Sequence, residues 1–130
     1  MSGQAVTSFE DLVAWQRARA LVREVFAATA QPPLAQRFGF RDQLERAAVS
    51  VMSNIAEGFE RGSRAEFHHF LSIAKGSCAE VRSLLYAGHD ANLLSLAAFE
   101  RLISIATETS RVIGGLRASV GRQRNNPPPP

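Results

Sequence analysis

Apolar residues in this chain recur at intervals of three and four, and that spacing restricts its fold more than any other feature. Within residues 40–61, five apolar residues follow one another at steps of four, three, four and four: Leu44, Ala48, Val51, Ile55 and Phe59. Residues at these steps share one face of a helix. No stretch alternates between apolar and polar residues for long enough to predict a strand. The chain is therefore expected to be all-α.

Capping and breaking residues divide this pattern into four helices. The expected ranges are 9–29, 40–61, 64–89 and 96–119. Ser8, Ser63 and Ser95 are the predicted N-caps, with Glu66 completing a capping box after Ser63. Short links between four helices predict an up-down-up-down bundle over residues 9–121. Residues 1–8 are expected to be a flexible N-terminus, and residues 122–130, with four prolines, a disordered basic tail.

Composition agrees with one small globular domain and excludes several classes. The 130 residues are 45% hydrophobic and 21% charged, which is typical of a single compact core. A single cysteine, Cys78, excludes an intrachain disulfide. The apolar runs are too short for a membrane helix, and the first residues do not resemble a secretory signal. We expect a cytoplasmic protein without a membrane partner.

Two of the expected helices are apolar on more than one face. The second stripe contains Val49, Met52 and Ala56 in the second helix, and Ile105, Val112 and Leu116 in the fourth. A helix that is apolar over most of its circumference needs more than one packing partner. The predicted oligomer interface is therefore Val49, Met52, Ile105 and Val112. The alternative is that these are ordinary scattered surface residues.

The second helix also carries a polar stripe, which includes Ser50, Asn54, Glu57 and Arg61 at steps of four, three and four. Serine and asparagine are mediocre helix formers, so their presence on one face calls for a reason. A hydrogen-bonded network, inside the chain or between subunits, is one interpretation. An ordinary exposed face is the other.

The segment Ser50-Val51-Met52-Ser53-Asn54-Ile55-Ala56-Glu57-Gly58 resembles the S-I/V-x-x-N-I-A-E-G signature of a family of small bacterial four-helix-bundle proteins. That family occurs in intervening sequences of large-subunit ribosomal RNA genes, and it includes the accessory variability proteins of diversity-generating retroelements. Further similarity covers Phe9 to Ala18, Arg37 to Ala48 and Arg61 to Glu80. Gln36 and Cys78 depart from the family's usual residues, and the fourth helix shows little similarity.

The resemblance implies a ring-like homopentamer without established enzymatic activity. It also implies nucleic acid and a reverse transcriptase as partners for the retroelement members. The matching polar residues look structural in this light. The predicted polar network is Ser50, Asn54, Glu57, Arg61, Ser63, Ser77 and Glu80.

Basic residues form two groups, within a net charge of +3. The third helix carries Arg64, His68, Lys75, Arg82 and His89 at steps of four, seven, seven and seven, and a seven-residue step returns to within about 20° of the same direction. The second group follows the last acidic residue, Glu108: Arg111, Arg117, Arg122 and Arg124. Such surfaces bind phosphates. The alternative is a solvated face that happens to lack acidic residues.

Other chemistry is weakly represented. Glu66 and His69 have the spacing of one half of a di-iron ligand set, but no second Glu-x-x-His follows, so we expect no metal. Cys78 is expected to be structural, and no phosphate loop or nucleophile elbow occurs, so we expect neither a cofactor nor an enzyme. Two hypotheses remain: an oligomer that binds RNA or DNA without sequence preference, and a scaffold that presents its ring to a protein partner.

Overall fold

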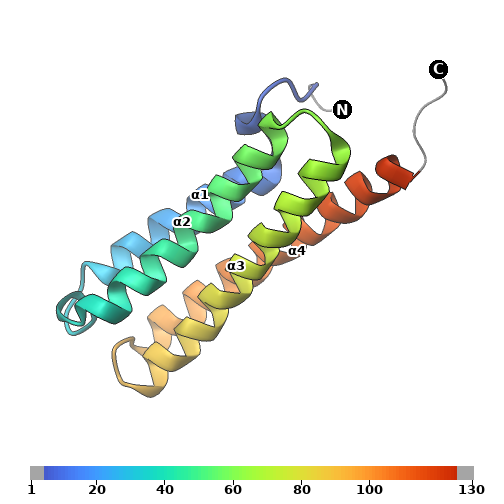
Figure 1. Cartoon of the computed structure of the whole chain (residues 1–130). Coiled ribbons are helices and arrows are strands. Elements are labelled where there is room, and N and C mark those ends of the chain that lie inside the picture. The colour runs from blue at the N-terminus through green and yellow to red at the C-terminus, as the bar shows by residue number, and fades with distance from the viewer. Residues whose placement is uncertain (1–4, 126–130) are drawn as a thin grey trace.

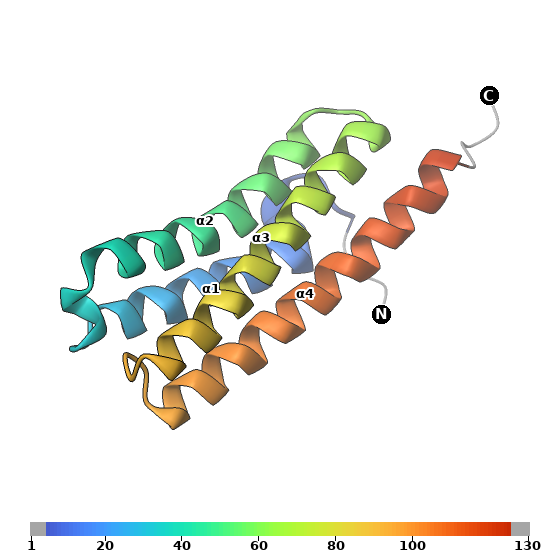
Figure 2. The ribbon, with the colours of Figure 1, turned by 60° about the horizontal axis from the view of Figure 1, so that its bottom comes forward.

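The computed structural model describes residues 5–125, and those residues contain four long helices and no strand. The helices are α1 (Val13–Thr29), α2 (Phe38–Glu60), α3 (Arg64–Asp90) and α4 (Leu96–Asn125). Two short 3-10 helices, η1 (Phe9–Asp11) and η2 (Leu34–Gln36), precede α1 and α2. Each helix contacts the next, and α4 returns to contact α1 (Figures 1 and 2). The predicted all-α, four-helix bundle is confirmed.

The core lies along the axis of the bundle, and all four helices contribute to it. The predicted face of α2 is confirmed, because Leu44, Ala48, Val51 and Ile55 are all fully buried. Leu21 and Val25 from α1, Leu71 and Leu85 from α3, and Leu102 and Ile113 from α4 complete this core. Burying such side chains contributes about 1.5–3 kcal/mol each relative to exposure.

Serine caps begin α3 and α4 where the sequence predicts. The Ser63 hydroxyl accepts the Glu66 amide N–H at 3.1 Å, and Ser95 accepts that of Ala98 at 3.1 Å. The prediction for the first helix was wrong at its start: Ser8 caps only η1, Leu12 is extended, and α1 begins at Val13 instead of residue 9. At the N-terminus, the Asp11 carboxylate accepts the backbone N–H groups of Thr7 and Ser8, and these bonds lower its pKa. Residues 7 and 8 are therefore hydrogen-bonded to η1, although they belong to the N-terminal segment that was predicted to be flexible.

The fourth helix is longer than expected. It continues through residues 122–125, which the sequence analysis assigned to the tail; residues 126–130 lie outside the described part of the chain. Gly114 and Gly115 do not interrupt it, because Ile113 and Val120 are buried on either side of them. With 30 residues against 17 in α1, α4 extends past the beginning of α1 and lies beside the first turns of α3 (Figure 2).

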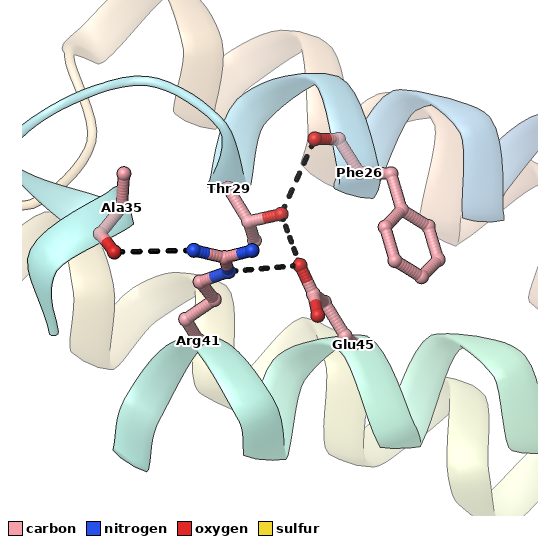
Figure 3. Close-up of polar contacts among 5 residues, drawn as sticks. All are labelled: Phe26, Thr29, Ala35, Arg41 and Glu45. Carbon is pink, nitrogen blue, oxygen red and sulfur yellow. Dashed lines mark hydrogen bonds and ion pairs between the residues drawn. The ribbon is translucent and has the colours of Figure 1, made fainter. Parts of the chain in front are cut away.

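A half-buried polar cluster joins α1 to α2 at the link between them (Figure 3). Thr29, only 1% exposed, donates its hydroxyl to Glu45 Oε2 at 2.5 Å. Arg41 contacts the same Glu45 oxygen at 3.3 Å and donates to the Ala35 carbonyl at 3.2 Å. Both helices and the intervening segment are thereby held by one carboxylate and one guanidinium.

Candidate nucleic-acid interface

The two predicted basic groups meet along the line where α3 packs on α4. From α3, Lys75 Nζ donates to Ser110 Oγ at 3.3 Å, and Arg64 Nη1 donates to the Gln123 carbonyl at 3.4 Å. From α4, Arg117 Nε donates to Ser72 Oγ at 2.7 Å. We use the term basic seam for five residues along this line: Arg64, His68, Lys75 and Arg82 from α3, and Arg117 from α4.

The stripe on α3 only partly faces solvent: Arg64 and Lys75 are exposed, whereas His68, Arg82 and His89 are half-buried. A Cβ built on Gly121 of α4 would lie 3.2 Å from the His68 ring, so this histidine lies against α4. Arg82 and His89 are half-buried, and His89 stacks on Phe99 of α4 with ring centroids 4.7 Å apart. The reason is angular: the seven-residue positions point between the core and solvent, which is where the neighbouring helix packs.

Charge is left uncompensated along the seam. Within the described residues, no ion pair includes Arg64, Lys75, Arg82 or Arg117. Arg64, Lys75 and Arg117 donate to serine hydroxyls or a backbone carbonyl, whereas the buried Nε of Arg82 has no hydrogen-bond partner there. Elsewhere carboxylates neutralise some of the arginines, whereas Arg17, Arg19, Arg23 and Arg37 form no ion pair with any described residue. The pairs are Arg41–Glu45, Arg46–Asp42, Arg61–Glu57 and Arg101–Glu24. A neutral acceptor orients a cation without cancelling its field, so the seam is an attractive site for anions.

The remaining arginines of the second basic group do not join the seam by any contact seen here. Arg111 forms an ion pair with Glu108, and this carboxylate weakens the attraction of Arg111 for a phosphate. Arg122 is exposed on the last turns of α4. The side chain of Arg124 lies outside the described part of the structure.

The predicted polar network divides into two groups. Between α2 and α3, the hydroxyls of Ser50 and Ser77 are 2.8 Å apart, and Asn54 Nδ2 donates to the Ser50 carbonyl and hydroxyl at 2.9 Å. This half-buried group lies within one chain, so no second subunit is needed to satisfy it.

The other group is exposed and surrounds the α2–α3 turn. Arg61 contacts Glu57 at 2.8 Å and Glu66 at 3.7 Å, and Ser63 is the N-cap of α3. Glu80 belongs to neither group: it is exposed and makes no hydrogen bond or ion pair with any other described residue.

The apolar residues predicted for the oligomer interface are mostly used inside the chain. Met52, Ile105 and Val112 are partly buried and pack against the chain's own core. Only Val49 is exposed, at 38%. The most exposed aromatic residues instead include Phe38, at 73%, and Phe26, which lines a shallow α1–α2 groove with Val49. Phe26 follows Val25 and Leu21 at helical spacing, yet it is 44% exposed while those two residues are fully buried.

Cys78 is buried, and its thiol donates to the Ala106 carbonyl at 3.2 Å. Burial raises the pKa of this thiol to about 11, so it carries almost no thiolate at neutral pH. Among residues 5–125, no three histidine, cysteine or acidic side chains gather as a metal site would require. Nor does any helix within this range have the length and apolar character to span a membrane.

The model of one protein family, described as 23S rRNA-intervening sequence protein, matches residues 10–115. This chain belongs to that family, which confirms the ribosomal branch of the predicted resemblance; the retroelement branch stays a prediction. A solved structure of similar fold is a protein with unknown function from the S23 ribosomal protein family of Bacteroides thetaiotaomicron. It has a TM-score of 0.74 and 21% identity, over 82% of this chain and 96% of that one. No curated protein matches this chain.

Proposed function

We propose that this chain is a non-catalytic protein that binds nucleic acid by phosphate contacts along the basic seam. One observation carries the proposal: Arg64, Lys75 and Arg117 of the seam donate to neutral acceptors, and the buried Nε of Arg82 has no hydrogen-bond partner among the described residues. Several arginines on other faces are instead paired with carboxylates, among them Arg41, Arg46 and Arg101. Phosphates supply the missing negative charge. Membership of a family that occurs in ribosomal RNA intervening sequences is in keeping with an RNA or DNA ligand.

The extent of the seam suits a polymer better than a small anion. Arg64 and Arg82 are eighteen positions apart on α3, which is about 27 Å at 1.5 Å per residue. Contacts spread over this length reach several phosphates of one strand. Since the seam provides charge and few shaped polar recesses, binding is expected to tolerate many sequences and to depend strongly on salt.

Assembly would multiply this modest charge, and a homopentameric ring is the form we propose. A ring joins two different patches of neighbouring copies. Two grooves lie away from the seam. The one between α1 and α4 is mainly apolar and contains Val13 and Val112. The one between α1 and α2 combines Phe26 and Val49 with four polar or charged residues. Contact between these grooves would leave every α3–α4 seam exposed, so weak phosphate contacts would act together.

The test is charge reversal with a control of equal net charge. Lys75→Glu with Arg82→Glu removes two seam cations. Arg23→Glu with Arg37→Glu makes the same change at exposed positions away from the seam. Fluorescence anisotropy with a mixed-sequence RNA and a duplex DNA, over a range of salt concentrations, measures the affinity. We expect the seam variant to bind at least tenfold more weakly, with a shallower salt dependence, and the control to bind nearly as the wild type does.

Deletion of residues 122–130 is expected to have a smaller effect than the seam variant, because most of the contacts proposed here precede that segment. Two results would overturn the proposal: wild type that binds neither ligand at low salt, or a control that loses as much affinity as the seam variant. The exposed α1–α2 groove favours a second candidate, a scaffold that binds a protein partner, and the first of these results would leave that candidate in place.

A further inference from the structure

An exposed aromatic side chain lies at one end of the basic seam. This is Tyr86, the single tyrosine of the chain, which follows Arg82 by four residues on α3. The residue is 55% exposed. Its ring meets Phe99 of α4 edge to face, with centroids 5.0 Å apart and an interplanar angle of 67°. Phe99 is itself held by the stacked ring of His89. Tyr86 is therefore anchored on packed aromatic residues while more than half of it faces water.

Tyr86 extends the line of the seam along α3. Lys75, Arg82 and Tyr86 are separated by steps of seven and four, so their directions from the helix axis differ by no more than about 40°. The rise from Lys75 to Tyr86 is about 16 Å, and that from Arg82 is about 6 Å. One strand of nucleic acid that follows α3 can therefore reach all three side chains.

The charges at this end favour a base over a phosphate. Asp90 ends α3, and Glu100 follows Phe99 in α4; both are exposed. These carboxylates disfavour a phosphate beside Tyr86, whereas a neutral base is little affected by them. Exposed aromatic rings next to cations are the groups on which proteins stack unpaired bases.

We propose that Tyr86 stacks on an unpaired base of a single-stranded nucleic acid whose phosphates contact Lys75 and Arg82. This inference rests on the proposed function of the seam and narrows its ligand to single-stranded RNA or DNA. In a duplex the bases are stacked on one another and cannot present a face to Tyr86. Single strands should therefore gain from this contact, and duplexes should not.

The test compares variants of Tyr86 on two ligands, a single-stranded mixed-sequence RNA and the duplex of the same sequence. Tyr86→Leu keeps apolar packing on Phe99 but removes the aromatic face, and Tyr86→Phe keeps both. Phe38→Leu is the control, because Phe38 is 73% exposed on α2 and belongs neither to the seam nor to the grooves proposed for assembly. We expect Tyr86→Leu to weaken single-strand binding about tenfold and to leave duplex binding unchanged. Tyr86→Phe and Phe38→Leu should bind as the wild type does.

A second measurement detects the contact directly. Irradiation of the wild type with a 5-bromouridine-substituted single strand should crosslink the peptide that contains Tyr86, as identified by mass spectrometry. Equal losses on single strands and duplexes, or unchanged binding by Tyr86→Leu, would overturn this inference while the seam proposal stands. If wild type binds neither ligand, the seam proposal itself fails and this inference fails with it.

Discussion

Two residues of the signature segment have clear physical roles in the bundle. Asn54 satisfies its side-chain amide on Ser50, which in turn reaches Ser77 of α3. Gly58 lets the end of α2 approach α3 closely: a Cβ at this position would lie 2.5 Å from Phe70 Cβ. Each residue thus serves the contact between α2 and α3, which places α3 and its basic residues correctly.

The close approach at Gly58 leads to a prediction for alanine. Gly58→Ala gains up to about 1 kcal/mol of helix propensity, but the added methyl group must displace the neighbouring helix, which costs about 1–3 kcal/mol and more if the backbone resists. We expect a net loss of stability in urea denaturation. Gly76→Ala in α3 is the matched control, because a Cβ there meets nothing within 4 Å. The control should be neutral or more stable, and a stabilised Gly58→Ala would contradict the packing argument.

At the scale of elements, polar groups decide how the α1–α2 link is held. Thr29 and Glu45 are separated by sixteen residues, yet their oxygens are 2.5 Å apart (Figure 3). Thr109 of α4 is equally buried, but its hydroxyl donates to the Ile105 carbonyl of its own helix. The Thr29 hydroxyl also lies 3.2 Å from the Phe26 carbonyl of its own helix. The two threonines therefore differ in that only Thr29 has, in addition, an acceptor on a neighbouring helix.

That contrast gives a paired experiment. Thr29→Val removes the hydroxyl but keeps the shape, so the half-buried Glu45 loses a donor and stability should fall by about 1–3 kcal/mol. Thr109→Val breaks no link between helices, and we expect a change of at most about 0.5 kcal/mol. Thermal or urea denaturation of both variants checks this. If both variants lose the same stability, the hydrogen bond from Thr29 to Glu45 contributes no more than a bond within one helix.

At the scale of the whole molecule, the bundle has two unlike sides. The α1–α2 side carries two ion-paired arginines, Arg41 and Arg46, and the groove that contains Phe26 and Val49. The α3–α4 side carries the basic seam, in which Arg64, Lys75, Arg82 and Arg117 make no ion pair with any described residue. This separation allows one side to bind other copies of the chain while the other binds a polyanion.

The proposed assembly predicts a mass near five times 14.2 kDa by light scattering. Phe26→Asp with Val49→Asp should reduce this mass to that of the monomer without lowering the helical content, because both side chains are exposed in the single chain. Ile105→Asp or Val112→Asp should instead destabilise the chain itself, since both residues pack against its core. A wild type that is monomeric at every concentration would contradict the ring.

The sequence by itself determined the local structure of this protein. Apolar spacing placed Leu44, Val51 and Ile55 on the buried face of α2, and Ser63 and Ser95 marked the starts of α3 and α4. These features depend on residues within one or two turns of one another, so they can be read along the chain. The end of α4 was misjudged because the burial of Val120, contributed by contacts outside its own turn, outweighs the cost of the Gly114-Gly115 pair.

Only the tertiary structure decided which helix covers each flank of its neighbour. Lys75, Ile105 and Phe26 each lie on their own helix near the boundary between its core face and its solvent face. Helical spacing alone does not say which residues at such a boundary are buried. In the folded chain, α4 packs over the flank of Lys75, the core covers part of Ile105, and Phe26 remains exposed. Helical periodicity gives a direction for each side chain, but burial there depends on partners distant in sequence, and on the order and angle in which four helices pack.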